Sequence, residues 1–597
     1  MSGGRTDRDR RIAGILAQLT LADKVGLMFQ VAVEVGPGGA LVEEPSAFLD
    51  VGTSALIRDR RITHVNVASA ASPADIAAWV NALQRVALAE GRVPVTVSTD
   101  PRHSFRRTPG VAFAADGFSE WPESLGFAAI GDVATVRDFA ATVREEYRAV
   151  GIRAALHPQI DLPTEPRWGR QVQTWGVDRD RVDSFLAASL EELQRRDGDA
   201  VGVACTVKHF PGGGPQRGGE DPHFPYGREQ DYPAEAFEEH LEPFRRAIAC
   251  GAAAMMPYYG MPVGLVRGGE PIEQVGFGFN RQMIRGVLRD ELGFDGVVVT
   301  DWGLLTDDVV GDRVLPARAW GVEALSVEER MRKALDAGVD QFGGEHETAT
   351  LLALVDRGLV SEERIDESAA RLIGVKLDLG LFDDPWVDES RVAERVGTPE
   401  ARAAGRRAQS DSVVVAAVGD AARGFVPLPE GCAVFLVGVD AEVAGGYARV
   451  VGDPADADAV LWRTDAPWEP RDHYFFERGF HAGSLAFPDE TIDRLRAYAA
   501  HAPVVADVFL DRPALLGQLA PFVDTLTVTF GCSDAAYLDV LFGRVPARGT
   551  LPVDIPASMD QVLRHPTDSL LPLPGAFLPR GAGFTTDTTD TTDTKDA

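Results

Sequence analysis

The sequence predicts an α/β protein, with an N-terminal (β/α)8 TIM-like barrel followed by an α/β sandwich domain with a mostly parallel sheet. Three observations predict this fold class. Eight short apolar runs alternate with helical segments in the first part of the chain. A second, shorter alternation of the same kind follows a polar segment. Polar residues stand directly after most runs of the first series, where an α/β barrel carries its functional groups.

The predicted strands of the barrel are short runs rich in valine and alanine. They cover residues 26–33, 64–69, 94–100, 152–160, 202–208, 252–258, 296–301 and 338–342. The segments between them have the apolar spacing of amphipathic helices. These predicted helices cover residues 73–90, 134–149, 180–197, 233–250, 280–292 and 326–337. Residues 345–385 are predicted to form the helices that close the barrel.

The second unit is predicted from a further series of apolar runs. Its expected strands lie near 412–418, 433–439, 459–463, 503–509 and 525–530. The tail is rich in threonine and aspartate, a composition of low complexity that is expected to be disordered. The predicted division of the chain is 1–385 for the catalytic barrel, 386–405 for a linker, 406–580 for the sandwich domain and 581–597 for the tail.

The composition disfavours several classes of partner. The chain has 597 residues, a formal net charge of −31 and 45% apolar residues. Nucleic acid and anionic membrane surfaces need clustered lysine and arginine, so neither is an expected partner of so acidic a protein. A small neutral substrate suits this charge better. A homo-oligomer is compatible with the sequence.

The cysteines and the N-terminal residues indicate the cellular location that is expected for the protein. Cys205, Cys250, Cys432 and Cys532 have neither CxxC nor metal-ligand spacing, so reduced thiols are expected. The N-terminal residues are polar and no apolar segment typical of a secretory signal follows them. No apolar run is long enough for a membrane span. A cytoplasmic location is therefore expected, and no metal or other cofactor is implied.

Six of the predicted barrel strands lead into charged, polar or aromatic residues. These residues are Asp100 after the third strand, Asp161, Arg167, Trp168 and Arg170 after the fourth, Lys208 and His209 at the fifth, Tyr258 and Tyr259 at the sixth, Asp301 and Trp302 at the seventh, and Asp340 at the eighth. Charged residues are rarely placed at the ends of buried strands unless they are paired or used. At one barrel mouth they would form a ring of hydrogen-bond donors and acceptors with flat aromatic faces, which suits a sugar.

Four motifs resemble glycoside hydrolase family 3 in their residues, order and spacing. They are DKVGLM at 23–28, PRWGR at 166–170, KHFPG at 208–212 and GFDGVVVTDW at 293–302. Residues 412–415 and 549–553 are similar to the second domain of that family. The resemblance covers roughly residues 10–560. It implies a barrel followed by a sandwich, and a retaining exo-β-glycosidase that releases a terminal β-D-glucosyl residue by double displacement, without a cofactor.

The resemblance also implies roles for single residues. Asp301 is the implied nucleophile, and Trp302 is expected to pack on the sugar. Asp100, Arg167, Lys208 and His209 would hold the hydroxyls of the terminal sugar, and Tyr258 or Tyr259 would lie beside the nucleophile. The chemistry agrees, because a retaining glycosidase needs an ionised carboxylate to attack the anomeric carbon. Neighbouring cationic side chains favour that ionised form.

The acid/base residue is expected from the second unit. A long aromatic and acidic loop follows the predicted strand 459–463, and Glu469 in it looks most like the family's acid/base glutamate. Arg463 and Thr464 stand where a Gly-Glu pair often occurs, so Glu477 and Asp465 remain alternatives. A rival pair, Asp221 and His223, resembles the Asp–His pair of the family's N-acetylglucosaminidase branch. In this chain proline replaces the expected serine between them, and the histidine usual after KHFPG is absent.

Three classes of function therefore remain open at this point. The first is a β-glucosidase-like exo-glycosidase. The second is a β-xylosidase or another exo-β-glycosidase of the same family, and within this class a β-N-acetylglucosaminidase is less favoured. The third is carbohydrate binding without catalysis, which the presence of Asp301 together with Asp100, Lys208 and His209 argues against.

Overall fold

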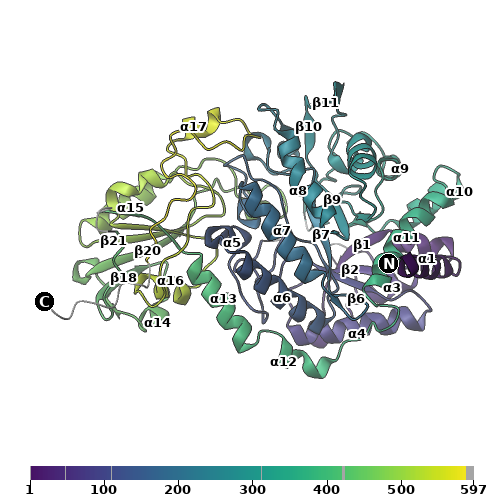
Figure 1. Cartoon of the computed structure of the whole chain (residues 1–597), viewed down its shortest axis with the longest axis horizontal. Helices are drawn as coiled ribbons and strands as arrows, with labels where there is room; N and C mark the ends of the chain where they lie inside the picture. The colour runs from purple at the N-terminus through teal and green to yellow at the C-terminus, as the bar shows by residue number, and fades with distance from the viewer. Residues whose placement is uncertain (1, 47–48, 109–110, 311, 420–423, 587–597) are drawn as a thin grey trace.

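The computed structural model describes residues 2–46, 49–108, 111–310, 312–419 and 424–586. Figure 1 shows two lobes side by side, each built around one large sheet. The first lobe contains the N-terminus and an eight-stranded sheet, and the second contains a six-stranded sheet near the C-terminus. The chain is thus an α/β protein.

All strands of the first sheet run parallel. They are β1 (Phe29–Val33), β2 (His64–Val67), β3 (Thr96–Thr99), β4 (Ala154–Ala155), β7 (Ala204–Phe210), β9 (Ala254–Pro257), β13 (Val297–Val298) and β16 (Phe342–Gly343). Their order is β13-β9-β7-β4-β3-β2-β1-β16, so neighbours in the sheet follow the chain except at β16. Each of the eight runs predicted from the sequence overlaps one of these strands.

The two edges of this sheet meet. Val299 and Gln341 form a parallel bridge between the chain after β13 and the chain before β16. The amide of Thr300 donates to the carbonyl of Gln341 at 2.9 Å, and the amide of Gln341 donates to the carbonyl of Val298 at 3.1 Å. The sheet is therefore strongly curled, and the carboxyl ends of its strands come together.

Helices between the strands cover the outside of the curled sheet (Figure 1). They include α4 (Pro73–Ala89), α6 (Val133–Val150), α7 (Arg179–Leu193), α8 (Phe237–Ala249), a π-helix (Gln282–Glu291), α9 (Val327–Ala337), α10 (Thr348–Asp356) and α11 (Glu362–Asp378). Local sequence sets their ends, as at α9. There the Ser326 hydroxyl accepts from the amide of Glu329, and the Glu329 carboxylate accepts from the amide of Ser326.

The second sheet has the order β17-β22-β21-β20-β18-β19. Its strands are β17 (Val414–Val418), β18 (Ala433–Val437), β19 (Arg449–Val450), β20 (Ala459–Asp465), β21 (Val504–Phe509) and β22 (Thr525–Thr529). Only the β17–β22 pair is antiparallel. The sequence did not predict β19, because two exposed residues carry no strand periodicity. Separate apolar clusters cover the two faces of this sheet.

The segment between the lobes and the end of the chain were predicted as linker and tail. Residues 386–405 include a short 3-10 helix, α12 (Val392–Arg395) and the start of α13 (Pro399–Asp411). Near the end, the amide of Phe584 donates to the carbonyl of Val415 at 2.8 Å. The rest of the predicted tail, residues 587–597, lies outside the described residues.

Lys376 on α11 is buried beneath the amino ends of the first sheet. Its Nζ donates to the carbonyls of Thr63 and Pro94 at 2.8 and 2.9 Å and to Oγ1 of Thr96 at 2.8 Å. These acceptors stand at the starts of β2 and β3, so the side chain fixes α11 against the sheet. Burial lowers the pKa of Lys376 to about 7.

We expect Lys376 to make the free energy of unfolding rise with pH above about 7. In the unfolded chain a lysine stays charged up to about pH 10.4, so over this range the unfolded state binds a proton that the folded state does not. Stability from this group therefore increases with pH. Lys376→Met should reduce the slope of the free energy of unfolding against pH by up to about 1.4 kcal/mol per pH unit.

Denaturant unfolding at several pH values from neutral to mildly alkaline measures this slope. Lys333→Met is the control, because it removes a partly exposed lysine that pairs with Glu273 at 2.7 Å. The control should keep the wild-type slope. Equal slopes for wild type and Lys376→Met would disprove the effect.

Candidate active site

A cavity of about 270 Å³ opens at the carboxyl ends of the first sheet. We call it the mouth cavity. Its polar and aromatic lining includes Asp100, Arg170, Lys208, His209, His223, Tyr259, Asp301 and Trp302. Three phenylalanines of the second lobe, Phe475, Phe476 and Phe480, complete one side. Ligand pockets are typically about 300–1,000 Å³, so this volume suits one sugar ring better than a long chain.

Asp301 lies just beyond β13 and is 8% exposed. Its Oδ1 accepts from the amide of Trp302 at 2.9 Å. Its Oδ2 is buried and has no hydrogen-bond partner among the described residues. A buried carboxylate oxygen without a partner is costly in a folded protein, which marks it as an atom kept for a ligand.

Trp302 is held beside Asp301 by close approach to a pair of glycines. A Cβ on Gly343 would come within 2.7 Å of the indole, and one on Gly344 would do the same. Gly344 also has a positive φ of 73°. The glycines after β16 therefore let the indole lie directly against the backbone, while its other side lines the mouth cavity.

Asp100, just after β3, and Lys208, on β7, form a buried pair across the intervening strand β4. Lys208 Nζ donates to Asp100 Oδ1 at 3.4 Å, and Asn66 Nδ2 donates to Asp100 Oδ2 at 3.2 Å. Burial raises the pKa of Asp100 and lowers that of Lys208, and in each case the partner's charge opposes the effect. The two residues offer a sugar hydroxyl an acceptor and a donor side by side.

His209 is a neutral acceptor in this site. Its Nδ1 donates to Asp161 Oδ2 at 2.8 Å, which leaves Nε2 to accept from Arg170 Nη1 at 3.2 Å. Burial and then the charge of Arg170 hold the pKa of His209 well below its ordinary value. The 3.7 Å approach of His209 Nε2 to Asp301 Oδ2 is therefore not an ion pair. Burial raises the pKa of Asp161 to about 6.

The structure places Arg170, and not Arg167, at the mouth cavity. Arg167 forms two hydrogen bonds to Glu165, at 2.7 and 2.9 Å, and does not line the cavity. Arg170 is 3% exposed and is also fixed by Gln159 and Gln173, each at 3.0 Å. The sequence could not separate these arginines, because they stand three residues apart in one loop and only the turn between them decides which points inward.

Of the two predicted tyrosines, Tyr259 lines the cavity and Tyr258 does not. The Tyr259 hydroxyl donates to the carbonyl of Trp302 at 2.6 Å. Burial, and then the nearby Asp301, raise the pKa of Tyr259 far above its ordinary value. Tyr258 is fully buried, with its ring 4.5 Å from that of His209, so it supports the imidazole from behind.

The three acids predicted on the second-lobe loop do not line the mouth cavity. Glu469 accepts from the amide of Ser484 at 3.0 Å, and its side chain is 57% exposed. Glu477 is buried against Tyr226, whose hydroxyl donates to it at 2.8 Å. Asp465 pairs with Arg106 at 2.5 Å. The loop does reach the cavity, but its phenylalanines and not its acids line it.

His223 is the titratable residue of the rival pair that does line the cavity. Its Nδ1 donates to Asp221 Oδ1 at 2.6 Å, and Trp168 Nε1 donates to Asp221 Oδ2 at 3.1 Å. Burial opposes ionisation of Asp221, but the charge and hydrogen bonds of His223 outweigh it and lower the pKa of this carboxyl. The Nε2 of His223 has no hydrogen-bond partner among the described residues and remains available on the cavity side.

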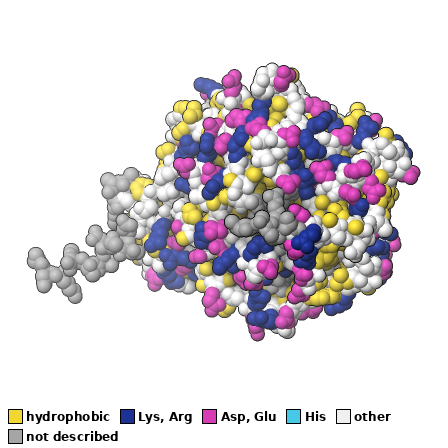
Figure 2. All heavy atoms as spheres, turned by 45° about the vertical axis from the view of Figure 1, so that its right-hand side comes forward, with side chains coloured by type: hydrophobic (Ala, Val, Ile, Leu, Met, Phe, Trp, Pro, Cys, Tyr) yellow, Lys and Arg dark blue, Asp and Glu magenta, His cyan; other side chains and the backbone are white. Residues whose placement is uncertain are grey.

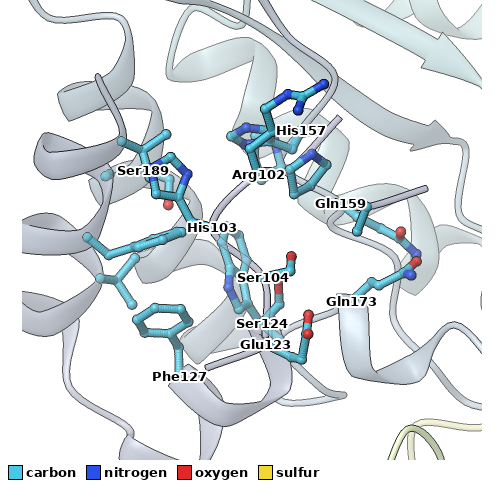
Figure 3. A pocket seen from close by; sticks show the side chains of 18 of the residues that line it. Arg102, His103, Ser104, Glu123, Ser124, Phe127, His157, Gln159, Gln173 and Ser189 are labelled. Atoms are coloured by element: carbon cyan, nitrogen blue, oxygen red, sulfur yellow. The ribbon is translucent and has the colours of Figure 1, made fainter. Parts of the chain in front are cut away.

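Figure 3 shows a second cavity, with a volume of about 70 Å³. Lys208 lines both this cavity and the mouth cavity. Its polar lining includes Ser104, Glu123, Gln159 and Gln173. Burial raises the pKa of Glu123 to about 7. A water molecule occupies about 30 Å³ in the liquid, so this cavity is too small for a sugar.

The rest of the surface and fold add few other candidate sites. On the face shown in Figure 2, acidic and basic side chains are interspersed. Among the described residues, no group of three or more His, Cys, Asp or Glu is arranged to hold a metal ion. None of the described helices is both long and apolar enough to cross a membrane. The four cysteines are all unpaired.

The site holds a carboxylate with an unpartnered oxygen, surrounded by buried donors and acceptors and flanked by indole and phenyl faces. This arrangement is typical of a glycoside hydrolase. The chain belongs to glycosyl hydrolase family 3. The family model for the N-terminal domain of this family matches residues 20–375.

Similar proteins extend over nearly the whole chain. A protein named beta-glucosidase C from Emericella nidulans is 42% identical over 93% of this chain and 88% of its own length. A periplasmic beta-glucosidase/beta-xylosidase from Dickeya chrysanthemi is 36% identical over 94% and 88%. The solved structure of a β-glucosidase from Erythrobacter marinus shares the fold, with a TM-score of 0.78, 23% identity and coverage of 97% of this chain and 83% of that one.

Proposed function

We propose that this protein is a retaining exo-β-glucosidase, which releases a terminal β-D-glucosyl residue from oligosaccharides or other glycosides. One observation carries the proposal. The unpartnered Oδ2 of Asp301 lies in a cavity the size of one sugar, beside Asp100, Lys208, His209 and Arg170. The similarity to beta-glucosidase C from Emericella nidulans, which extends over 93% of the chain, supports the same activity.

We also infer that the first sheet is a complete (β/α)8 barrel. The bridge between Val299 and Gln341 supports this, since it joins the two edge strands. The domain boundaries at residues 385 and 405 stay a prediction. So do the cytoplasmic location and any oligomeric state.

In the proposed first step, Asp301 Oδ2 attacks the anomeric carbon and the bond from that carbon to the leaving-group oxygen breaks. The product is a glycosyl ester of Asp301 and a free aglycone. Asp100 accepts hydrogen bonds from sugar hydroxyls, and charge-assisted bonds of this kind are the strong ones. Lys208 and Arg170 donate to other sugar oxygens, and Trp302 covers one face of the ring.

The leaving-group oxygen needs a proton, and we infer that His223, which lines the cavity, gives it. Because Nδ1 of His223 is bound to Asp221 at 2.6 Å, the transferable proton sits on Nε2 at the cavity. Asp221 stabilises the imidazolium in the same way that a buried aspartate does in other histidine-based sites. In the second step Nε2 takes a proton from water, the water oxygen attacks the anomeric carbon, and the ester to Asp301 breaks. Glu469 remains the alternative that the sequence predicts.

A panel of 4-nitrophenyl glycosides tests the substrate. We expect kcat/KM to be highest for the β-D-glucoside. A β-D-xyloside lacks only the hydroxymethyl group, and one missing carbon substituent in a pocket changes kcat/KM by about 10–200-fold, so it should be a weaker substrate. The α-glucoside is the control and should not be hydrolysed.

Three outcomes would favour a function other than the proposed one. A preference for the xyloside would favour the β-xylosidase alternative, which the printed name of the Dickeya chrysanthemi relative also includes. A preference for the N-acetyl-β-D-glucosaminide would favour the other branch of the family. No hydrolysis of any β-glycoside, with a measurable affinity for glucose, would favour binding without catalysis.

A further inference from the structure

Two loops from different lobes meet beside the mouth cavity. The 217–227 loop of the first lobe carries Asp221 and His223. The 466–481 loop of the second lobe follows β20 and carries Glu469 and Glu477, which do not line the cavity. The contacts between the two loops lie on both sides of the Asp221–His223 pair.

On one side, Arg471 ties the loops together through charge. Its guanidinium forms two hydrogen bonds to Glu220, at 2.5 and 2.9 Å, and lies 5.0 Å from the ring of Tyr226. The Tyr226 hydroxyl in turn donates to Glu477 at 2.8 Å. Paired N–H bonds to a carboxylate fix its orientation as well as its distance. Glu220 directly precedes Asp221, so Arg471 restrains the backbone that bears the catalytic pair.

On the other side, aromatic rings restrain the imidazole itself. The ring of Phe480 lies 4.5 Å from that of His223, and the ring of Tyr259 lies 4.8 Å from it. Phe480 also packs edge-on against Phe224 at 5.5 Å, and Phe224 stacks on Tyr474. The bond to Asp221 fixes one ring atom but leaves the ring free to tilt. These neighbours limit that tilt and keep Nε2 directed at the cavity.

The 466–481 loop has a rigid base from which to do this. Arg512 is fully buried and donates to five carbonyl groups. Pro467 lies at the start of the loop, Ala482 directly follows its end, and Arg167 belongs to the first lobe. The loop is therefore anchored to both lobes at its base before its tip reaches the 217–227 loop.

We propose that the 466–481 loop positions His223 for proton transfer, with Phe480 and Arg471 as the positioning residues. The inference rests on the proposed role of His223 as acid and base. The second lobe then contributes to catalysis by holding a first-lobe histidine in place, and it need not supply a carboxylate of its own.

A series of substituted phenyl β-D-glucosides tests this, because a good leaving group departs without a proton and a poor one needs it. The variants are Phe480→Leu, which removes the ring and keeps most of the volume, and Arg471→Met. We expect kcat/KM to fall about 10-fold for the phenyl glucoside, as a misplaced catalytic group costs about 10- to 100-fold. It should fall less than about 2-fold for the 2,4-dinitrophenyl glucoside, whose leaving group needs no proton.

Conservative variants and matched controls separate positioning from simple loss of structure. Phe480→Tyr and Arg471→Lys should restore most of the activity on the phenyl glucoside. Phe487→Leu alters another buried phenylalanine of the second lobe. Arg544→Met removes an arginine that pairs with Glu430 and lies over Tyr447 in the same way, away from the cavity. Both controls should change all substrates by the same factor.

The outcomes distinguish this inference from the proposed function. A uniform loss across the series in Phe480→Leu and Arg471→Met would overturn positioning and leave Phe480 as a contact of the aglycone. If His223→Ala shows the leaving-group dependence and these two variants do not, the positioning inference fails alone. If His223→Ala shows no such dependence, the proposed role of His223 fails and the inference fails with it.

Discussion

Replacing Asp301 by asparagine is expected to reduce kcat on aryl β-glucosides by at least about 10³-fold. The amide has the shape of the carboxylate, and its oxygen can still accept from the amide of Trp302, a bond of 2.9 Å in the wild type. What it lacks is the nucleophilic charge at the buried Oδ2. The substrate should therefore still bind, and the loss should lie in kcat more than in KM.

Trapping the intermediate identifies the nucleophile directly. A 2-fluoro-2-deoxy β-glucoside with a dinitrophenyl leaving group slows the second step more than the first, so the glycosyl ester should accumulate. Mass spectrometry of peptides should then find the sugar on the peptide that contains Asp301. Asp308→Asn is the matched control, because Asp308 also lines the cavity but pairs with Arg318 at 2.9 Å. A label on any other carboxylate would refute the assignment.

His223→Ala is expected to have the second largest effect, and its size should depend on the leaving group. Loss of a general acid costs about 10²- to 10⁴-fold, and this loss should appear in kcat/KM for the phenyl glucoside. The 2,4-dinitrophenyl glucoside should be far less affected, because its leaving group needs no proton. Added azide should restore turnover by attacking the ester, since it needs no general base, and the product should be β-glucosyl azide.

The same measurements on Glu469→Gln decide between the two acid/base assignments. Glu469 is 57% exposed and bonded to the amide of Ser484 outside the cavity, so this variant should behave like the wild type across the leaving-group series. Leaving-group dependence and azide rescue in Glu469→Gln, with neither in His223→Ala, would assign proton transfer to the second lobe instead.

The sequence by itself determined the strand framework and most of the charged groups at the strand ends. A buried parallel strand is a continuous apolar run, and the first polar residue after it stands at the carboxyl edge of the sheet, so both can be located without coordinates. Asp100, Lys208, His209 and Asp301 were predicted in this way and line one cavity. Their convergence follows from the regular geometry of the sheet.

Only the tertiary structure decided which loop residues join them. A sequence pattern cannot tell which of Arg167 and Arg170, or which of Tyr258 and Tyr259, points into the cavity. It cannot do so for the acids of the 466–481 loop either, because a loop has no periodicity that fixes where a side chain points. Their directions depend on contacts made with other parts of the chain. Glu165 binds Arg167 and holds it away from the cavity, and Phe480 from the second lobe packs against His223 at the edge of the cavity. The contact between Phe480 and His223 joins residues that are distant in the sequence, so it exists only once the two lobes have packed together.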